Sequence, residues 1–252
     1  MKPQVYIDPR PEEFFTKYHV RTRTRRPDWV YRLARVVLTI PVLLVYRFRA
    51  IDVDIVPYEG PVILAPNHFS FLDHFFIAVL LRREVQFMAK SQLFKPPVLD
   101  FILTHGGTFP VRRGQKDQEA FDTAYTILNR GATVLMYAEG GRSRSKRLGE
   151  PKPGLGRLVM ESGVPVVPIA IHGSQNVREL KRGRISPKVT VQYGKPILYE
   201  RVEHPTRDQS QAVADEVFAR VEEMYEALNA QGRRGVLAGL RQERRHGAPV
   251  TG

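Results

Sequence analysis

Cysteine is absent from the 252 residues of this sequence, and tryptophan occurs once. The absence of cysteine excludes disulfide bonds, thiolate metal sites and cysteine nucleophiles, and it fits a reducing compartment. Residues 1–28 also lack the apolar core and the small-residue cleavage site of a secretory signal. We therefore expect no such signal in this region.

Acidic residues are scarce relative to basic ones. The chain has 39 lysine and arginine residues against 26 aspartate and glutamate residues, a formal net charge of +13 at pH 7. Such a field favours an anionic partner: nucleic acid, anionic lipid, or a substrate that carries phosphate or coenzyme A. The alternative is that arginine serves only as a solubilising residue. Nucleic acid is not an expected partner, because no binding motif is present and the aromatic residues fall mostly in apolar segments.

A hydrophobic run long enough to cross a bilayer is missing unless charged residues are included. Residues 36–46 form an uncharged stretch of eleven residues, about 16 Å of helix against a bilayer core of ~30 Å. We predict a helix over 29–49, in which Arg32, Arg35 and Thr39 form one polar stripe. The remaining surface is apolar, which favours an amphipathic helix lying in the membrane interface.

Two other interpretations of this helix stay open. It would dock on the domain's own core, or it would span the bilayer from Trp29 onward with a kink at Pro41. The interfacial interpretation makes Trp29 and the flanking arginines anchors and anionic membrane lipids a partner. It predicts a membrane-associated protein, peripheral or monotopic, on the cytoplasmic face of the plasma membrane.

From residue 50 onward, short apolar β-branched segments alternate with helical ones. This alternation predicts an α/β fold with a mixed, largely parallel sheet flanked by helices, whose functional loops gather at the carboxyl ends of the strands. The predicted strands are 53–56, 62–65, 85–89, 108–111, 133–138, 166–171 and 189–193. The predicted helices are 71–81, 97–103, 116–128, 156–161 and 209–228.

The chain divides into three parts on this basis. Residues 1–50 form a basic arm and the interface helix, 51–228 a catalytic domain, and 229–252 a basic tail. We expect residues 1–28 to be extended or poorly ordered, and the tail to hold a short helix and a loose end.

His68 and Asp73 lie five residues apart, just after the strand predicted at 62–65. On one ideal helix they would face about 140° apart. Pairing therefore requires His68 to precede the helix, with its ring folded back over the first turn. A histidine oriented by a carboxylate in this way is a general base near neutral pH. The alternative is a capping box from Ser70 to Asp73, in which the aspartate only caps the helix.

Three further segments follow this pair along the chain: GGTFPVR at 106–112, AEGGRS at 138–143 and VPVVP at 164–168. Together with Asn67-His68-x4-Asp73, they resemble the four signature blocks of the glycerolipid acyltransferases. The best-known bacterial members of that family are the 1-acylglycerol-3-phosphate acyltransferases. The resemblance covers roughly residues 53–196 and departs from the family pattern at Gly141, where threonine is usual.

The resemblance implies a glycerol-3-phosphate acyltransferase-like fold in which His68 and Asp73 are the catalytic pair. Arginine guanidinium groups and glycine N–H groups would hold the phosphate or polar head of the acceptor. Lys90 would polarise the thioester carbonyl or meet donor phosphates, and Glu139 would orient Arg142 or accept from a glycerol hydroxyl. The expected substrate-binding residues are Asn67, Lys90, Gly107, Phe109, Arg112, Glu139, Gly140, Arg142 and Pro168.

Three of these residues have more specific expectations. Asn67 would hold the turn or help to bind the oxyanion. Pro168 interrupts a strand, which indicates a sheet edge or a bulge, and it would shape the wall of the site. Gly140 would let backbone N–H groups approach an anion closely.

The implied reaction transfers a fatty acyl group from acyl-CoA or acyl carrier protein to the hydroxyl of a lysophospholipid. The first expected acceptor is 1-acylglycerol-3-phosphate, which gives phosphatidate. No metal and no cofactor are expected beside the acyl co-substrate. Alternatives with the same fold acylate glycerol 3-phosphate, another lysophospholipid or a lipid without phosphate. A more distant alternative is a non-catalytic basic protein that binds membranes or nucleic acid.

Overall fold

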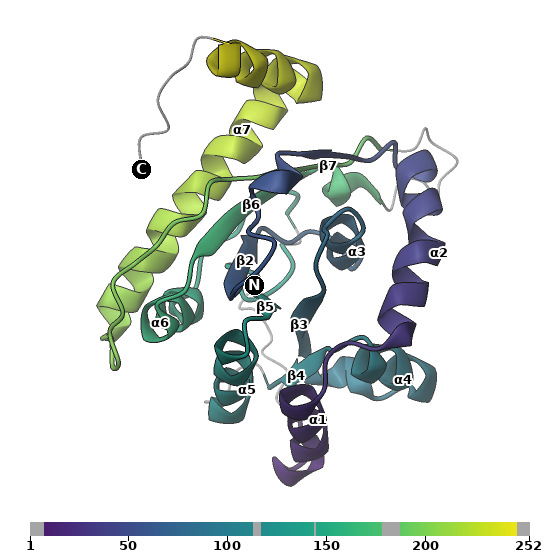
Figure 1. Cartoon of the computed structure of the whole chain (residues 1–252), viewed down its shortest axis with the longest axis vertical. Helices are drawn as coiled ribbons and strands as arrows, with labels where there is room; N and C mark the ends of the chain where they lie inside the picture. The colour runs from purple at the N-terminus through teal and green to yellow at the C-terminus, as the bar shows by residue number, and fades with distance from the viewer. Residues whose placement is uncertain (1–7, 113–116, 144, 178–186, 246–252) are drawn as a thin grey trace.

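The computed structural model describes residues 8–112, 117–143, 145–177 and 187–245. Its centre is a seven-stranded sheet with the order β1-β7-β6-β2-β5-β3-β4 (Figure 1). Neighbouring strands are parallel except β6 and β7, which are antiparallel. The strands are β1 (Arg49–Ile51), β2 (Val62–Pro66), β3 (Val85–Lys90), β4 (Phe109–Val111), β5 (Thr133–Leu135), β6 (Val166–His172) and β7 (Thr190–Tyr193). The predicted mixed, largely parallel sheet is confirmed.

Helices cover both faces of the sheet. Strand β2 shows the division: Ile63 and Ala65 join a core with α5, α6 and α7, whereas Val62 and Leu64 join a core with α2 and α3. Alternate residues of a strand point to opposite faces, and a parallel sheet covered on both sides is apolar throughout. The helices are α1 (Glu13–Thr24), α2 (Trp29–Val45), α3 (Asp73–Ala78), α4 (Pro97–His105), α5 (Gln118–Asn129), α6 (Pro153–Ser162) and α7 (Arg207–Arg245).

The prediction of an extended or poorly ordered arm is wrong for the described part of residues 1–28. Residues 13–24 form helix α1, which packs against α5 and β4. Its buried face consists of Phe15, Tyr18, His19 and Thr22, at the i, i+3, i+4, i+7 spacing of an amphipathic helix. The many arginines between these positions hide that period in the sequence.

Two further expectations change. The strand predicted at 53–56 is wrong: residues 53–55 form a 3₁₀ turn, and β1 comes before it. Asp52 has a φ of 59°, a left-handed conformation that ends the strand. Near the C-terminus, α7 bends at Gly232, whose φ and ψ are not helical, and helix resumes as far as Arg245. The predicted short helix is therefore present, and the end predicted to be loose lies largely outside the described residues.

Helix α2 packs Val30, Tyr31 and Val42 against the domain, and Arg35 of its polar stripe lies on this side as well. The Arg35 guanidinium donates to the carbonyls of Val79 and Leu81, and Arg32 pairs with Glu84 at 3.3 Å. The side of the helix away from the domain is apolar and exposed: Trp29, Leu33, Val36, Val37, Ile40 and Leu44. Within the described ranges, no helix has the length and hydropathy needed to cross a membrane.

The contact between α6 and α7 gives a prediction about stability. A Cβ at Gly156 would lie 1.8 Å from the backbone oxygen of Ser210, so Gly156→Ala forces the two helices apart. Overpacking of this kind costs about 1–3 kcal/mol, which lowers the melting temperature by roughly 2–12 °C in a protein of this size. Thermal denaturation followed by circular dichroism measures the change.

Gly154→Ala on the same helix is the control. A Cβ there would first meet Met136 Cε at 3.1 Å, the end of a flexible side chain. Its effect should be below 1 kcal/mol, roughly. Equal melting temperatures for the two variants would contradict the described packing of α6 on α7.

Candidate active site

His68 lies in the turn between β2 and α3, at the carboxyl end of a central strand. Its Nδ1 is 2.9 Å from Asp73 Oδ2, and the same oxygen accepts from the backbone N–H groups of Phe69 at 2.8 Å and Ser70 at 2.7 Å. An oxygen approached by two backbone donors acts as an acceptor, so Nδ1 carries the proton and donates. The lone pair then sits on Nε2, the atom with which such a histidine acts as a base.

The structure pairs His68 with Asp73, and part of the capping-box pattern is present beside this pair. Asp73 is the first residue of α3 and reaches back to the N–H of Ser70, whose hydroxyl accepts from the N–H of Leu72 at 3.2 Å. The N-cap position of α3 is Leu72, which has no side-chain cap. The carboxylate oxygen of Asp73 therefore holds the turn before the helix and orients the histidine at the same time.

The loop after β5 holds the backbone of His68. Glu139 Oε1 accepts from the His68 N–H at 2.7 Å, and the N–H of Ser143 donates to the His68 carbonyl at 2.8 Å. Glu139 Oε2 accepts from the N–H of Gly149 at 2.8 Å. Glu139 was expected to orient Arg142 or to meet a glycerol hydroxyl, but both of its oxygens accept from backbone groups, one of His68 and one of Gly149.

Asn67 and Gly140 complete the two turns. The Asn67 amide accepts from the N–H of Ile171 at 2.7 Å and donates to its carbonyl at 3.1 Å, so it ties the turn to strand β6. Of the two roles expected for Asn67, these contacts match the holding of the turn. Gly140 has a φ of 65°, a left-handed conformation that glycine adopts without steric cost.

Two aromatic rings that sequence reasoning missed surround the imidazole of His68. The Tyr137 ring stacks on it with centroids 3.7 Å apart, and the His74 ring meets it edge-on at 5.5 Å. Burial lowers the pKa of His74 to about 4, so this histidine is neutral at pH 7. The signal in the sequence was small: Tyr137 stands two residues before Glu139, at the end of a strand.

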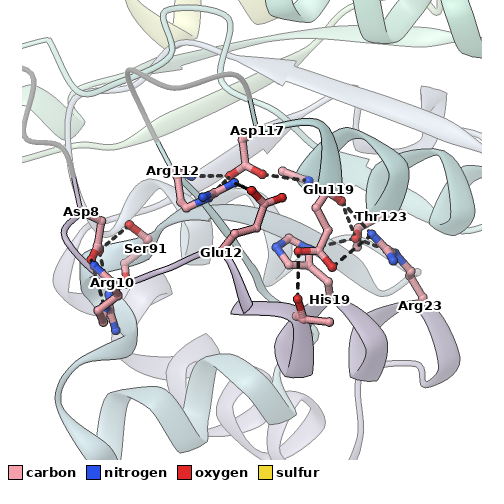
Figure 2. A network of polar contacts seen from close by, with 12 residues as sticks. Asp8, Arg10, Glu12, His19, Arg23, Ser91, Arg112, Asp117, Glu119 and Thr123 are labelled. Atoms are coloured by element: carbon pink, nitrogen blue, oxygen red, sulfur yellow. Dashed lines mark hydrogen bonds and ion pairs between the residues drawn. The ribbon is translucent and has the colours of Figure 1, made fainter. Parts of the chain in front are cut away.

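Arg112 follows β4 at the edge of the sheet and lies in a network of polar contacts (Figure 2). Its Nη2 is 2.9 Å from Glu12 Oε2, and its Nε is 3.6 Å from Asp117 Oδ2. Asp117 also accepts from the Arg112 N–H at 2.6 Å and from the N–H of Ala120 at 3.2 Å, as the N-cap of α5. Sequence reasoning predicted neither carboxylate as a partner of Arg112. Glu12 in particular belongs to the distant N-terminal arm.

Gly107 and Phe109 of the same block serve the fold. Gly107 has a φ of 75°, and a Cβ there would lie 2.6 Å from Pro27 Cγ. Phe109 is fully buried in the core shared with α5, α6 and α7. Gly107 precedes β4 at its amino end, whereas Arg112 follows its carboxyl end. Among Gly107, Phe109 and Arg112, it is therefore the Arg112 side chain that lies at the edge of the sheet where His68 lies.

Pro168 lies in β6, which is an inner strand between β7 and β2, so a sheet edge is excluded. The bulge is present instead: between the pairs Ile169–Tyr193 and Val166–Ile197, three residues of the partner segment face two of β6. The ladder is irregular where proline has no N–H to donate.

Lys90 and Arg142 are the remaining basic residues of the expected set. Lys90 ends β3, half-buried and opposite Val111 of β4. Arg142 is exposed in the loop after β5, and its charge helps to lower the pKa of His74, after the larger effects of burial and of His68. Strands β2, β5, β3 and β4 are neighbours and parallel, so His68, Arg142, Lys90 and Arg112 reach the same edge of the sheet.

An apolar cavity of about 300 Å³ lies beside this edge, between α2, α3 and α4. Its lining is almost entirely hydrocarbon, and His74 joins it to the ring cluster around His68. Residues of the lining include Tyr31, Leu38, His74, Phe75, Phe87 and Leu103.

The buried Glu139 carboxylate predicts a pH dependence of stability. Burial raises the pKa of Glu139 to about 7 from an ordinary 4.5, so the folded protein holds this proton to a higher pH than the unfolded chain. The contribution of Glu139 to stability is then largest below pH 4.5 and is lost as the pH rises through 7, by on the order of 3 kcal/mol. Urea unfolding between pH 4.5 and 8 measures it.

Glu139→Gln removes this titration. The unfolding free energy of the wild type minus that of Glu139→Gln should fall across this range and level off above pH 7. The exposed Glu150 provides the control, since Glu150→Gln should give a difference without such a slope. If this difference in unfolding free energy stayed flat or rose with pH, burial would not be destabilising the charged form of Glu139.

Known proteins resemble this chain in sequence. The sequence model described as Acyltransferase matches residues 47–172, half of the chain. A chloroplastic 1-acyl-sn-glycerol-3-phosphate acyltransferase of Brassica napus is 28% identical over 139 residues, 53% of this chain and 40% of that protein. A protein of the same description from Arabidopsis thaliana is 27% identical, with 53% and 39% covered. A glycerol-3-phosphate acyltransferase of Pseudomonas aeruginosa is 28% identical over 109 residues, 40% of this chain and 13% of its own length.

A solved structure resembles this chain in fold. The 1-acyl-sn-glycerophosphate acyltransferase of Thermotoga maritima superposes with a TM-score of 0.55 at 20% identity, over 84% of this chain and 88% of that one. This likeness concerns the fold alone. The sequence relatives are longer proteins, and the chain spans about 40% of the length of the plant enzymes. Because the family model covers half of the sequence, including the His68–Asp73 turn, this chain belongs to the Acyltransferase family.

Proposed function

We propose that this protein transfers a fatty acyl group from an acyl thioester to the hydroxyl of a lysophospholipid, with 1-acylglycerol-3-phosphate as acceptor and phosphatidate as product. The observation that carries the proposal is the buried His68–Asp73 pair at the end of β2, with Nδ1 committed to the carboxylate. The name shared by the two plant relatives supports the choice of acceptor.

The chemistry follows from the tautomer. Nε2 of His68 removes the proton of the acceptor hydroxyl while the oxygen attacks the thioester carbonyl. Asp73 then faces an imidazolium and stabilises it, as the aspartate of a serine hydrolase triad does. The new C–O bond forms, the C–S bond breaks, and the proton on Nε2 passes to the leaving thiolate. Coenzyme A and acyl carrier protein are both candidates for the thiol.

The arrangement of basic residues suits a phosphorylated acceptor. Strand β4 lies three strands away from β2, which is ~14 Å at 4.8 Å per strand, and a long arginine side chain bridges part of that span. We assign Arg112 and Arg142 to the acceptor phosphate, because guanidinium groups bind phosphate in a bidentate manner. Lys90, between them at the end of β3, is assigned to the thioester carbonyl or to donor phosphates.

The apolar cavity beside His74 suits an acyl chain. A lining that is almost entirely hydrocarbon disfavours water and accepts methylene groups, and the cavity adjoins the rings that surround His68. We propose that it receives the acyl chain of one of the two substrates, so that the reacting carbonyl or hydroxyl stops near Nε2.

A membrane surface explains the outer side of α2. Trp29, Val36, Ile40 and Leu44 are 63–73% exposed, and Val98 and Phe101 of the neighbouring α4 are exposed as well. Contiguous exposed apolar residues of this kind mark a membrane or partner surface. We propose that this face rests in the interface of an anionic membrane. Because acyl-CoA and acyl carrier protein are cytosolic, the cytoplasmic face of the plasma membrane is the proposed location.

A second acceptor is favoured by a specific observation. Several relatives from Pseudomonas are named glycerol-3-phosphate acyltransferase, so glycerol 3-phosphate is the alternative. A panel of labelled donors with lysophosphatidate, glycerol 3-phosphate, other lysophospholipids and a lipid without phosphate decides between them.

The first prediction concerns the general base. His68→Ala should lower turnover at least roughly 100-fold, the usual minimum for a general base, in an acyltransfer assay with labelled acyl-CoA and lysophosphatidate. His204→Ala, at an exposed histidine of the loop before α7, should keep the activity of the wild type. A folded His68→Ala protein with near-normal turnover would refute the mechanism.

The second prediction concerns the membrane face. Leu44→Glu should weaken co-sedimentation with vesicles of phosphatidylcholine and phosphatidylglycerol by about tenfold or more, since burying a leucine is worth ~1.5–3 kcal/mol. Leu198, which is 68% exposed against 73% for Leu44 and lies outside the proposed face, provides the matched control. If Leu198→Glu weakens binding as much as Leu44→Glu does, the face is wrongly assigned.

A further inference from the structure

We propose that Glu12 is an exchangeable counter-ion of Arg112, whose carboxylate occupies the place that the acceptor phosphate takes during the reaction. The N-terminal helix would thereby set how strongly charged an acceptor headgroup must be in order to bind. This inference rests on the proposed function, in which Arg112 meets the phosphate, and it adds a specificity-determining residue from outside the family-matched segment 47–172.

The two carboxylates beside Arg112 are not equivalent. Asp117 has a side chain only 4% exposed, and it accepts from the N–H groups of Arg112 and Ala120. Those bonds fix Asp117 as a permanent partner that orients the guanidinium. Glu12 has a side chain 55% exposed and meets Nη2 at 2.9 Å. The Arg112 side chain is itself only 9% exposed, so its charge needs an anionic partner. The half-exposed Glu12 carboxylate can return to water when a stronger anion takes its place.

The backbone that carries Glu12 is held on its N-terminal side. Asp8 is buried and accepts from the Arg10 guanidinium at 2.9 and 2.8 Å and from the Ser91 hydroxyl at 2.7 Å (Figure 2). Ser91 directly follows Lys90 at the end of β3. The segment before Glu12 is thus pinned to the same sheet edge as the proposed site.

The helix after Glu12 is held as well. His19 Nδ1 lies 2.9 Å from the Thr123 hydroxyl, and Arg23 Nε donates to the same oxygen at 2.9 Å. Since both flanks are anchored, exchange requires only that the exposed Glu12 side chain rotate. A phosphate monoester, with its greater charge and three terminal oxygens, competes well against a carboxylate for a guanidinium.

A positioning role for Glu12 would change phosphate affinity in the opposite direction. If Glu12 oriented Arg112 as Asp117 does, its removal would weaken phosphate binding instead of strengthening it. The direction of the measured change in affinity therefore distinguishes a competitor from a positioning residue.

The test uses glycerol 3-phosphate as probe and isothermal titration calorimetry on the full chain. Glu12→Gln should bind the probe about two- to fivefold more tightly than the wild type, since the half-exposed carboxylate no longer competes for the guanidinium. Glu13→Gln, at the neighbouring exposed residue of α1, removes the same charge and should bind like the wild type. In an Arg112→Ala background, Glu12→Gln should have no effect.

Four results would overturn the proposal. Three are unchanged or weaker binding by Glu12→Gln, an equal gain in Glu13→Gln, and a gain that persists without Arg112. The fourth is the absence of saturable binding in both the wild type and Glu12→Gln. Acyltransfer to lysophosphatidate is measured on the same proteins. A wild type that binds the probe but transfers no acyl group would refute the proposed function, while the calorimetric comparison still decides the role of Glu12.

Discussion

The site depends on one buried carboxylate oxygen. Asp73 is fully buried, and its Oδ2 accepts from His68 Nδ1 and from the N–H groups of Phe69 and Ser70. A buried charge is costly unless it is paired and hydrogen-bonded, and these three bonds to one oxygen stabilise the observed turn between β2 and α3. That folding places the imidazole over the first turn of the helix and selects its tautomer.

The strands on either side of β2 hold this turn in place. Strand β6 contributes Ile171, whose backbone pairs with the Asn67 amide, and the loop after β5 contributes Glu139 and Ser143, which bind the two backbone groups of His68. The histidine is thus fixed through its ring by its own turn and through its backbone by its neighbours. Residues that the sequence motifs led us to expect at the substrate instead hold the proposed base in position. Rigid elements support a site in this way.

Sequence reasoning predicted the layers of the fold and the His68–Asp73 pair, but not the partners that reach the site from distant parts of the chain. The apolar strands β2, β3, β5 and β6 are near their predicted positions because a doubly covered sheet requires continuous apolar runs. The ionic partners were invisible for a physical reason: Glu12 and Arg112 are 100 residues apart, and Glu139 and His68 are 71 apart. Such contacts depend on how whole helices and strands pack together. The local hydrophobic periodicity of the sequence carries no information about that packing.

Positive charge also has more than one use in this protein. Arg83 donates to the carbonyls of Pro57 and Gly60, and Arg130 donates to the carbonyl of Arg23, so part of the +13 charge cross-links backbone near the amino ends of the strands. These two arginines are thus engaged by backbone carbonyls of the protein itself. The number of basic residues alone therefore does not locate an anion-binding site. A basic side chain whose present partner can be displaced is a better candidate.

The proposed catalytic residues and the residue proposed to select the acceptor lie in different parts of the chain. His68, Asp73, Glu139 and Arg112 all lie within the family-matched segment 47–172, whereas α1 and α2 lie before it. The proposed base, its supports and the proposed phosphate ligand Arg112 lie in the family-matched segment, whereas Glu12 and the proposed membrane face of α2 lie in the N-terminal arm. Changes in that arm would alter which acceptor binds without touching the base, because Glu12 acts on Arg112 and not on His68. Acceptor preference within such a family would then follow the N-terminal helices more closely than the motif residues.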